Sequence, residues 1–165
     1  MDKVRLFIIS GPASVGKTTV ARILSAHLSE KTAIVDGDDV EKFGVAKEYS
    51  HYLFIKNARS LITNFLEEQI DVIFSHALSG EEIKEIIKDL KTEEIKVVYL
   101  IADLKTLELR NRTRSIEDQA RASLKEELDF FSKLKIDSNF ILDTSKLSLS
   151  QTAKAIISEK RFIIK

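Results

Sequence analysis

The chain of 165 residues is 44% hydrophobic and 32% charged, which is the composition of a folded globular protein rather than a disordered one. Its length predicts one domain spanning residues 1–165, at about 150 residues per domain. Lysine and arginine number 26, and aspartate and glutamate also number 26, so no net positive charge attracts nucleic acid or an anionic membrane. The absence of cysteine excludes disulfides, thiolate zinc sites and a cysteine nucleophile.

No stretch of the chain has the pattern of a membrane or export segment. No apolar run reaches the roughly 18 residues of a transmembrane helix. The run at residues 6–9 is too short for the core of a signal peptide. We therefore expect a cytoplasmic protein, a monomer or homodimer, that acts on a small molecule and binds neither nucleic acid nor membrane.

Strands and helices are predicted to alternate along the N-terminal half. The order is strand 4–10, helix 18–29, strand 32–36, helix 50–69 and strand 71–75. The apolar face of the first helix includes His27, which we expect to be a packed core residue. Alternating elements of this kind are typical of βαβ units.

The C-terminal half continues the alternation. The order is helix 79–90, strand 95–102, a charged helical stretch 104–134 with a break near Ser115, strand 140–142 and helix 148–157. Ser79 with Glu82 and Ser148 with Gln151 are capping boxes, which place two of the helix starts. The tail, residues 161–165, is consistent with a sixth strand, a helix end or a partner contact.

Strands separated by helices cannot close as hairpins. They are joined by crossovers, which produce a parallel sheet with helices on both faces. Ligands of such sheets bind beyond the carboxyl ends of the strands, so the loops after each strand are expected to surround one site.

The loop after the first strand matches a phosphate-binding motif. Residues 11–18 read GPASVGKT and fit G-x-x-x-x-G-K-[ST] without departure. Glycines let backbone amides approach phosphates, and the following helix directs its positive end to the same place. Lys17 is expected to reach the β- and γ-phosphates, and Thr18 to bind Mg²⁺. The predicted nucleotide contacts are Gly11, Ala13, Ser14, Val15, Gly16, Lys17, Thr18 and Thr19.

The same motif serves several classes of nucleotide-binding protein. No N-K-x-D segment is present to read guanine, which argues against a GTPase. The third strand ends in Phe74-Ser75-His76 without a carboxylate, which argues against an oligomeric remodelling ATPase.

Three acids follow the second strand, at Asp36, Asp38 and Asp39. Like charges repel unless a cation or a hydrogen-bonding ligand compensates, so Mg²⁺ or a substrate hydroxyl is expected nearby. The alternative for this segment is a solvated loop in which Asp39 caps the next helix.

The phosphate loop followed by Asp-x-Asp resembles the small P-loop kinases of metabolites, which include shikimate kinase, gluconate kinase and chloramphenicol phosphotransferase. The resemblance implies a three-layer α/β P-loop NTPase fold with strand order 2-3-1-4-5, and ATP and Mg²⁺ as ligands. It implies that Asp36 lies near Mg²⁺, as Thr18 does, and that Asp38 holds the accepting hydroxyl. Residues 75–78, Ser-His-Ala-Leu, are similar to the end of the third strand in gluconate kinases. His76 is a candidate substrate contact there.

Arginines cluster after the fourth strand, at Arg110, Arg112, Arg114 and Arg121. This segment resembles the helical lid of the same kinases, at about residues 104–121. Arg110 and Arg114 share a helical face and are expected to neutralise the transferring phosphoryl group, whereas Arg112 faces solvent. The alternative is a solvated helix.

Two further residues, Thr144 and Arg59, have two interpretations each. Thr144 follows the last strand, where the resemblance implies contact with the adenine base of the nucleotide. The alternative is an ordinary turn. Arg59 is either a reader of an acceptor's anionic group or a surface arginine. His51, like His76, lacks partners at metal-ligand spacing, so no zinc is assigned.

Together these features predict an ATP-dependent phosphotransferase. It would move the γ-phosphoryl group to a hydroxyl of a small metabolite, a sugar acid or similar, in a pocket built by residues 40–54. Lys17, Asp38, Arg110 and Arg114 would carry the catalysis. The alternatives are a nucleotide-binding module that switches a partner without turnover, and a nucleoside or nucleotide kinase. Sparse basic residues between positions 37 and 58 argue against a nucleotide acceptor.

Overall fold

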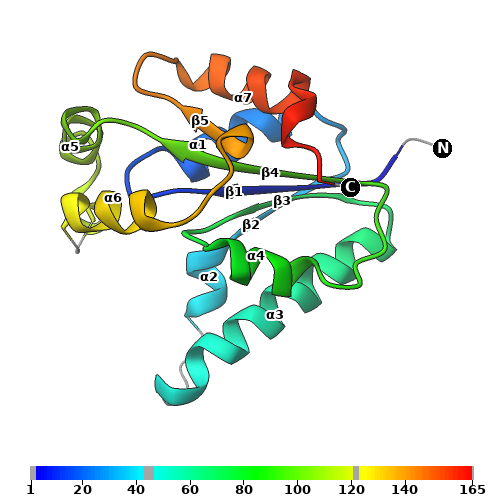
Figure 1. Cartoon of the computed structure of the whole chain (residues 1–165). Coiled ribbons are helices and arrows are strands. Elements are labelled where there is room, and N and C mark those ends of the chain that lie inside the picture. Colours follow the sequence, from blue (N-terminus) through cyan, green and yellow to red (C-terminus); the bar gives the residue numbers. More distant parts are fainter. Residues whose placement is uncertain (1–2, 43–46, 121–122, 165) are drawn as a thin grey trace.

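The computed structural model describes residues 3–42, 47–120 and 123–164 (Figure 1). Its five strands form one parallel sheet in the order β2-β3-β1-β4-β5, which confirms the expected topology. The strands are β1 Arg5–Ser10, β2 Thr32–Asp36, β3 Asp71–Ser75, β4 Glu94–Ile101 and β5 Ile141–Asp143.

Helices cover both faces of this sheet. They are α1 Lys17–Ser25, α2 Gly37–Glu41, α3 Lys47–Glu67, α4 Gly80–Ile87, α5 Leu104–Arg112, α6 Leu124–Lys133 and α7 Leu149–Ser158, with single turns η1 Ile116–Asp118, η2 Ser138–Phe140 and η3 Lys160–Phe162. In Figure 1, α1 and α7 lie on one face, α3 and α4 on the other, and α5 and α6 at the carboxyl ends of the strands.

The alternation of side chains along each strand builds two cores. In β1, Leu6 and Ile8 are fully buried in the cluster on the α3 and α4 side. Phe7 and Ile9 belong to the cluster with residues of α1 and α7. A strand buried on both faces reads as an unbroken apolar run, which is why β1 is recognisable from the sequence.

Two local expectations about the first half are wrong. Helix α1 ends at Ser25, so His27 lies past its apolar face and is exposed, with ring Nδ1 3.0 Å from the carbonyl oxygen of Ile23. Asp39 does not cap a helix. Asp36 is the N-cap of α2, where its carboxylate accepts from the Asp38 amide, and Asp39 instead pairs with Lys42.

The helix starts and the break in the charged stretch agree with expectation. Both capping boxes are present, at Ser79 with Glu82 and at Ser148 with Gln151. The predicted stretch 104–134 is divided into α5, η1 and α6, with Ser115 before η1.

The C-terminal tail packs on its own sheet. Phe162 is fully buried, Ile163 forms an antiparallel bridge with Lys96, and the Ile164 amide donates to the carbonyl of Ile95 at 2.9 Å. Because β5 pairs with β4 only from Tyr99 onward, the earlier part of β4 leaves an open edge that the tail covers.

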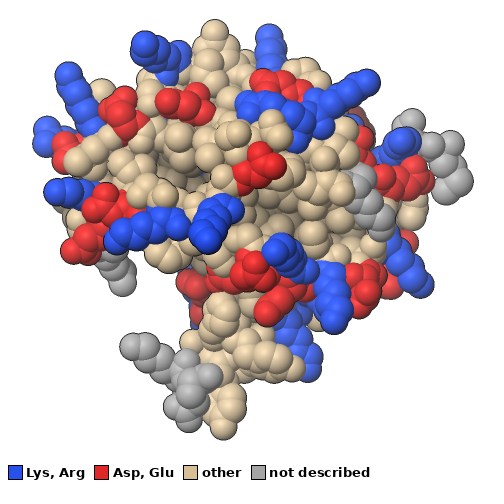
Figure 2. Space-filling view, in the orientation of Figure 1, with Lys and Arg blue, Asp and Glu red and all other residues tan. Residues whose placement is uncertain are grey.

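Charged side chains of both signs are interspersed over the face drawn in Figure 2, without an extended patch of one sign. Among the helices in the described part of the chain, none is both long enough and apolar enough to span a bilayer.

Candidate active site at the carboxyl ends of the strands

The loop between β1 and α1 has the backbone of an anion-binding nest. Gly11, Ser14 and Gly16 have φ values of 140°, 61° and 105°. A Cβ atom on Gly11 would lie 2.2 Å from the carbonyl oxygen of Leu100, so only glycine allows the chain to turn this close to β4. Amides in such a turn point inward, and α1 begins directly after it.

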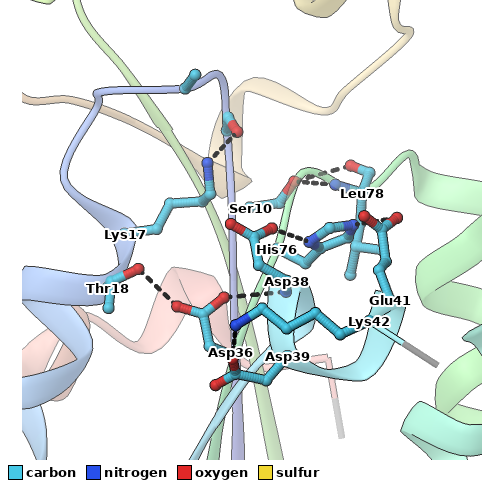
Figure 3. Close-up of polar contacts among 12 residues, drawn as sticks. Ser10, Lys17, Thr18, Asp36, Asp38, Asp39, Glu41, Lys42, His76 and Leu78 are labelled. Carbon is cyan, nitrogen blue, oxygen red and sulfur yellow. Dashed lines mark hydrogen bonds and ion pairs between the residues drawn. The ribbon is translucent and has the colours of Figure 1, made fainter. Parts of the chain in front are cut away.

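Lys17 folds back over this loop (Figure 3). Its Nζ donates to the carbonyls of Gly11 and Pro12 at 2.8 and 2.9 Å. Burial lowers the pKa of Lys17 to about 8, an effect that Glu127 and Asp38 partly oppose. The ammonium is thus held inside the loop, at the place where a polyphosphate would lie.

A carboxylate from α6 already binds the loop. Glu127 Oε2 accepts from the amide of Ala13 at 2.6 Å, and it is the strongest source of negative potential at Lys17. Sequence reasoning missed this residue, because 114 positions separate it from Ala13 and no motif marks it. The contact shows that the Ala13 amide of this loop is placed to donate to an anionic oxygen.

We expect Glu127→Gln to tighten ATP binding by roughly tenfold, because ATP then displaces a neutral amide instead of a charge-assisted hydrogen bond. Titration calorimetry with ATP measures the change. Glu126→Gln, at the exposed neighbouring position, is the control and should leave the affinity unaltered. Equal or weaker binding by Glu127→Gln would show that the carboxylate does not compete with phosphate.

The two residues expected to bind Mg²⁺ lie together. Thr18 Oγ1 donates to Asp36 Oδ2 at 2.8 Å (Figure 3). Ser75 pairs with Asp36 in the β2–β3 register, is 1% exposed, and its hydroxyl has no hydrogen-bond partner within the described residues. Hard oxygen donors beside an orphaned hydroxyl fit a hydrated Mg²⁺, whose waters would satisfy Ser75.

A second polar group joins the acids after β2 to the end of β3. His76 Nδ1 lies 3.3 Å from Asp38 Oδ1, and His76 Nε2 lies 3.3 Å from Glu41 Oε1. The hydrogen bond from His76 is the largest cause that lowers the pKa of Asp38 below its ordinary value. The ring packs against Phe54, with 4.7 Å between centroids, and against Gly37, where a Cβ atom would lie 2.4 Å from it.

The expectation that His76 lacks metal-ligand partners is wrong. One donor atom each from Asp38, Glu41 and His76 lie within 4.8 Å of one another, so the group can hold a cation. Spacing along the chain could not find it, because the carboxylates come from a different βα unit.

A cavity of about 500 Å³ opens beside His76. Its lining includes Val40, Glu41, Leu53, Phe54 and Glu82, so it coincides with much of the predicted pocket 40–54; residues 43–46 lie outside the described residues. A further cavity, of about 590 Å³, surrounds Arg5 and Asp71 at the amino ends of the strands. We assign function to the first, because ligands of parallel sheets bind at the carboxyl ends.

Buried hydroxyl contacts hold the cavity wall against the phosphate loop. Ser10 Oγ donates to the carbonyl of Leu78 at 2.8 Å and accepts from the Leu78 amide at 2.9 Å. The last residue of β1 therefore fixes the loop that carries His76 (Figure 3).

Two of the predicted lid arginines lie on the phosphate loop. Arg110 donates to the carbonyl of Val15 at 3.0 Å, and to the hydroxyl and carbonyl of Thr144 at 3.0 and 2.8 Å. Arg114 Nη1 lies 3.5 Å from Ser14 Oγ, which also donates to Asn111. Helix α5 and the turn after β5 are thus tied to the loop between β1 and α1.

Other predicted residues lie elsewhere. Arg59 Nη2 is 3.5 Å from Asp89 Oδ2 and does not line the cavity, so the structure does not bring it to the site. Thr19, expected at the nucleotide, is exposed, and Arg112 is exposed as expected. Arg121 lies outside the described residues.

Comparisons with known proteins are informative only at the level of structure. A scan against protein-family models and a sequence search of curated proteins both gave no match. A sugar kinase from Janibacter sp. HTCC2649 has a TM-score of 0.67 at 13% identity, with 93% of this chain and 90% of that one covered. The tunicamycin resistance protein of Deinococcus radiodurans has a TM-score of 0.67 at 19% identity, with 93% and 94% covered.

A gluconokinase from Sinorhizobium meliloti 1021 has a TM-score of 0.66 at 12% identity, with 94% of this chain and 91% of that one covered. Identities this low show a shared fold. The strand order, the turn between β1 and α1, and these neighbours agree: the chain has the fold of the small P-loop kinases.

Proposed function

We propose that this protein is an ATP-dependent kinase that phosphorylates a hydroxyl group of a small metabolite. One observation carries the proposal: Asp38, an ionised carboxylate held by His76 at a cavity, contributes to the potential at Lys17 in the phosphate loop. A base for the acceptor and a site for the phosphate donor are thus adjacent.

The loop residues account for the nucleotide. The Ala13 amide and the Lys17 ammonium bind phosphate oxygens once Glu127 and the loop carbonyls release them. Thr18 and Asp36 would hold Mg²⁺, which when bound would neutralise charge on the phosphates. Asp36 thereby takes the place of the carboxylate that the third strand lacks. Arg110 and Arg114 supply planar donors for the equatorial oxygens of the transferring group.

The reaction proposed is an in-line transfer. The acceptor hydroxyl oxygen bonds to the γ-phosphorus as the bond to the β–γ bridging oxygen breaks, and ADP leaves. Asp38 orients the hydroxyl and takes its proton. The neighbours support this class of reaction, since two of the three are named as kinases of sugars or gluconate.

The alternative, a nucleotide-binding switch without turnover, would need a surface for its partner, and a partner contact was one interpretation of the C-terminal tail. Phe162 is instead buried in the chain's own core, which leaves that alternative with less support.

ADP release in the presence of candidate hydroxyl compounds tests the proposal. We expect acceptors to raise ADP formation well above basal hydrolysis and to yield a phosphate ester detectable by ³¹P NMR. Tight ATP binding with no acceptor-dependent turnover across sugars, polyols, nucleosides and antibiotics would contradict it and favour the switch.

A further inference from the structure

Apart from two histidines, the ionisable side chains that line the cavity beside His76 are all acidic. Glu41 and Glu82 line it, and Asp38 is joined to it through His76. None of the described residues that line it is a lysine or an arginine. Apart from these carboxylates, its polar wall consists of neutral hydroxyl and amide groups and of histidines.

The acids are held in place as acceptors of hydrogen bonds. Glu82 Oε2 accepts from the Ser79 amide at 2.6 Å at the start of α4, and its other oxygen lies 3.7 Å from His51 Nδ1. Glu41 lies 3.3 Å from His76. The Ser79 amide thus fixes the position of the Glu82 carboxylate in the cavity wall.

The nearest described cations are engaged elsewhere. Lys42 is paired with Asp39 at 2.5 Å, Arg59 with Asp89, and Lys17 with the phosphate loop. Lys56 is exposed on α3 and does not line the cavity, and the side chain of Lys47 lies outside the described residues. No described lysine or arginine therefore faces the cavity to receive a carboxylate or phosphate of the acceptor.

The rest of the wall is apolar. Leu53, Phe54 and Val40 form one side, and the Phe54 ring lies in contact with the His76 ring. A ligand that fits here presents one apolar face and, toward Asp38, Glu41 and Glu82, hydroxyl or amine donors.

Resting on the kinase function, we propose that the acceptor is a polyhydroxyl compound without an acidic group, either uncharged or bearing an amine. An anionic substituent would be brought against Glu41 and Glu82 without a lysine or arginine as counter-ion, whereas hydroxyl and ammonium donors pair with the carboxylates. This class differs from the sugar acid suggested by the resemblance of residues 75–78, and it also excludes nucleoside monophosphates.

The test uses compounds matched in carbon skeleton. Sorbitol, glucosamine and gluconate form one such trio, and further trios of alcohol, amine and acid extend the panel. Turnover is measured by ADP release, and binding by thermal shift of the protein loaded with a non-hydrolysable ATP analogue. Within trios we expect the alcohol or the amine to exceed the acid at least tenfold in kcat/KM.

A charge reversal provides a second readout. Glu41 is exposed enough to accept lysine without loss of the fold, and Glu41→Lys should reduce the preference against the acid about tenfold. Glu30→Lys, an exposed position before β2 at the other end of the sheet, should leave the preference unchanged.

The outcomes distinguish a failure of the acceptor class from a failure of the kinase function on which it rests. Preference for the acid, or a preference unaffected by Glu41→Lys, overturns the acceptor class. Absence of binding by every trio in the ATP-loaded protein overturns the assignment of the cavity. Failure to bind ATP contradicts the kinase function itself.

Discussion

Replacing Lys17 with alanine is expected to weaken ATP binding about 100-fold and to reduce kcat about 1000-fold. The side chain is buried within the loop, and its ammonium is the only charged group that contacts the carbonyls of Gly11 and Pro12 in the described part of the chain. Its loss removes charge-assisted bonds to the phosphates and neutralisation during transfer. Calorimetry and steady-state turnover measure the two effects.

The pKa of Lys17 adds a pH signature to this prediction. Burial sets that pKa at about 8 in the free protein, and bound phosphates favour the charged form. Below pH 8 the ammonium is already charged, so the contribution of Lys17 to ATP affinity does not change with pH. Above pH 8 binding must take up a proton, so the affinity should fall about tenfold per pH unit until the pKa of the complex is reached.

The Lys17→Ala variant should show weak binding without this pH dependence. Lys31→Ala, at an exposed position at the amino end of β2, is the matched control and should behave as the wild type. Normal ATP affinity in the Lys17→Ala variant would remove the phosphate loop from the mechanism.

Replacing Asp38 with asparagine is expected to lower kcat by about 10²–10⁴-fold while ATP affinity changes little. The hydrogen bond from His76 lowers the pKa of Asp38, so the carboxylate is charged throughout the neutral range and able to accept a proton during transfer. Asparagine keeps the size of the side chain and loses that capacity. Because the Asp38 side chain is 79% exposed, the fold should tolerate the change.

Asp39→Asn is the control for this prediction. The two residues are adjacent, but Asp39 pairs with Lys42 at the surface and should be dispensable for turnover. Single-turnover kinetics at saturating ATP distinguish a loss of chemistry from a loss of binding. Full activity in Asp38→Asn, or an equal loss in both variants, would refute the assignment of Asp38 as the base.

How the site is built explains which of its parts can be predicted from the sequence. The turn at residues 11–18 depends on consecutive backbone angles and on the helix that follows, so glycine, lysine and threonine at fixed spacing predict it. Strands buried on both faces leave apolar runs, and capping boxes mark helix starts within four residues. Thr18 and Asp36 are also predictable, because adjacent βα units place them at one edge of the sheet.

Contacts between distant elements leave no such pattern. Glu127 of α6 contacts Ala13. Arg110 of α5 contacts both Thr144, which follows β5, and Val15 in the phosphate loop. His76 acquires Asp38 and Glu41 only because β2 and β3 lie side by side. By itself the sequence determined the turn of the phosphate loop and the alternation of strands and helices, since both depend on neighbouring residues. The tertiary structure alone decided which charged side chains line the cavity beside His76 and which carboxylate contacts the phosphate loop, since both depend on how separate elements pack.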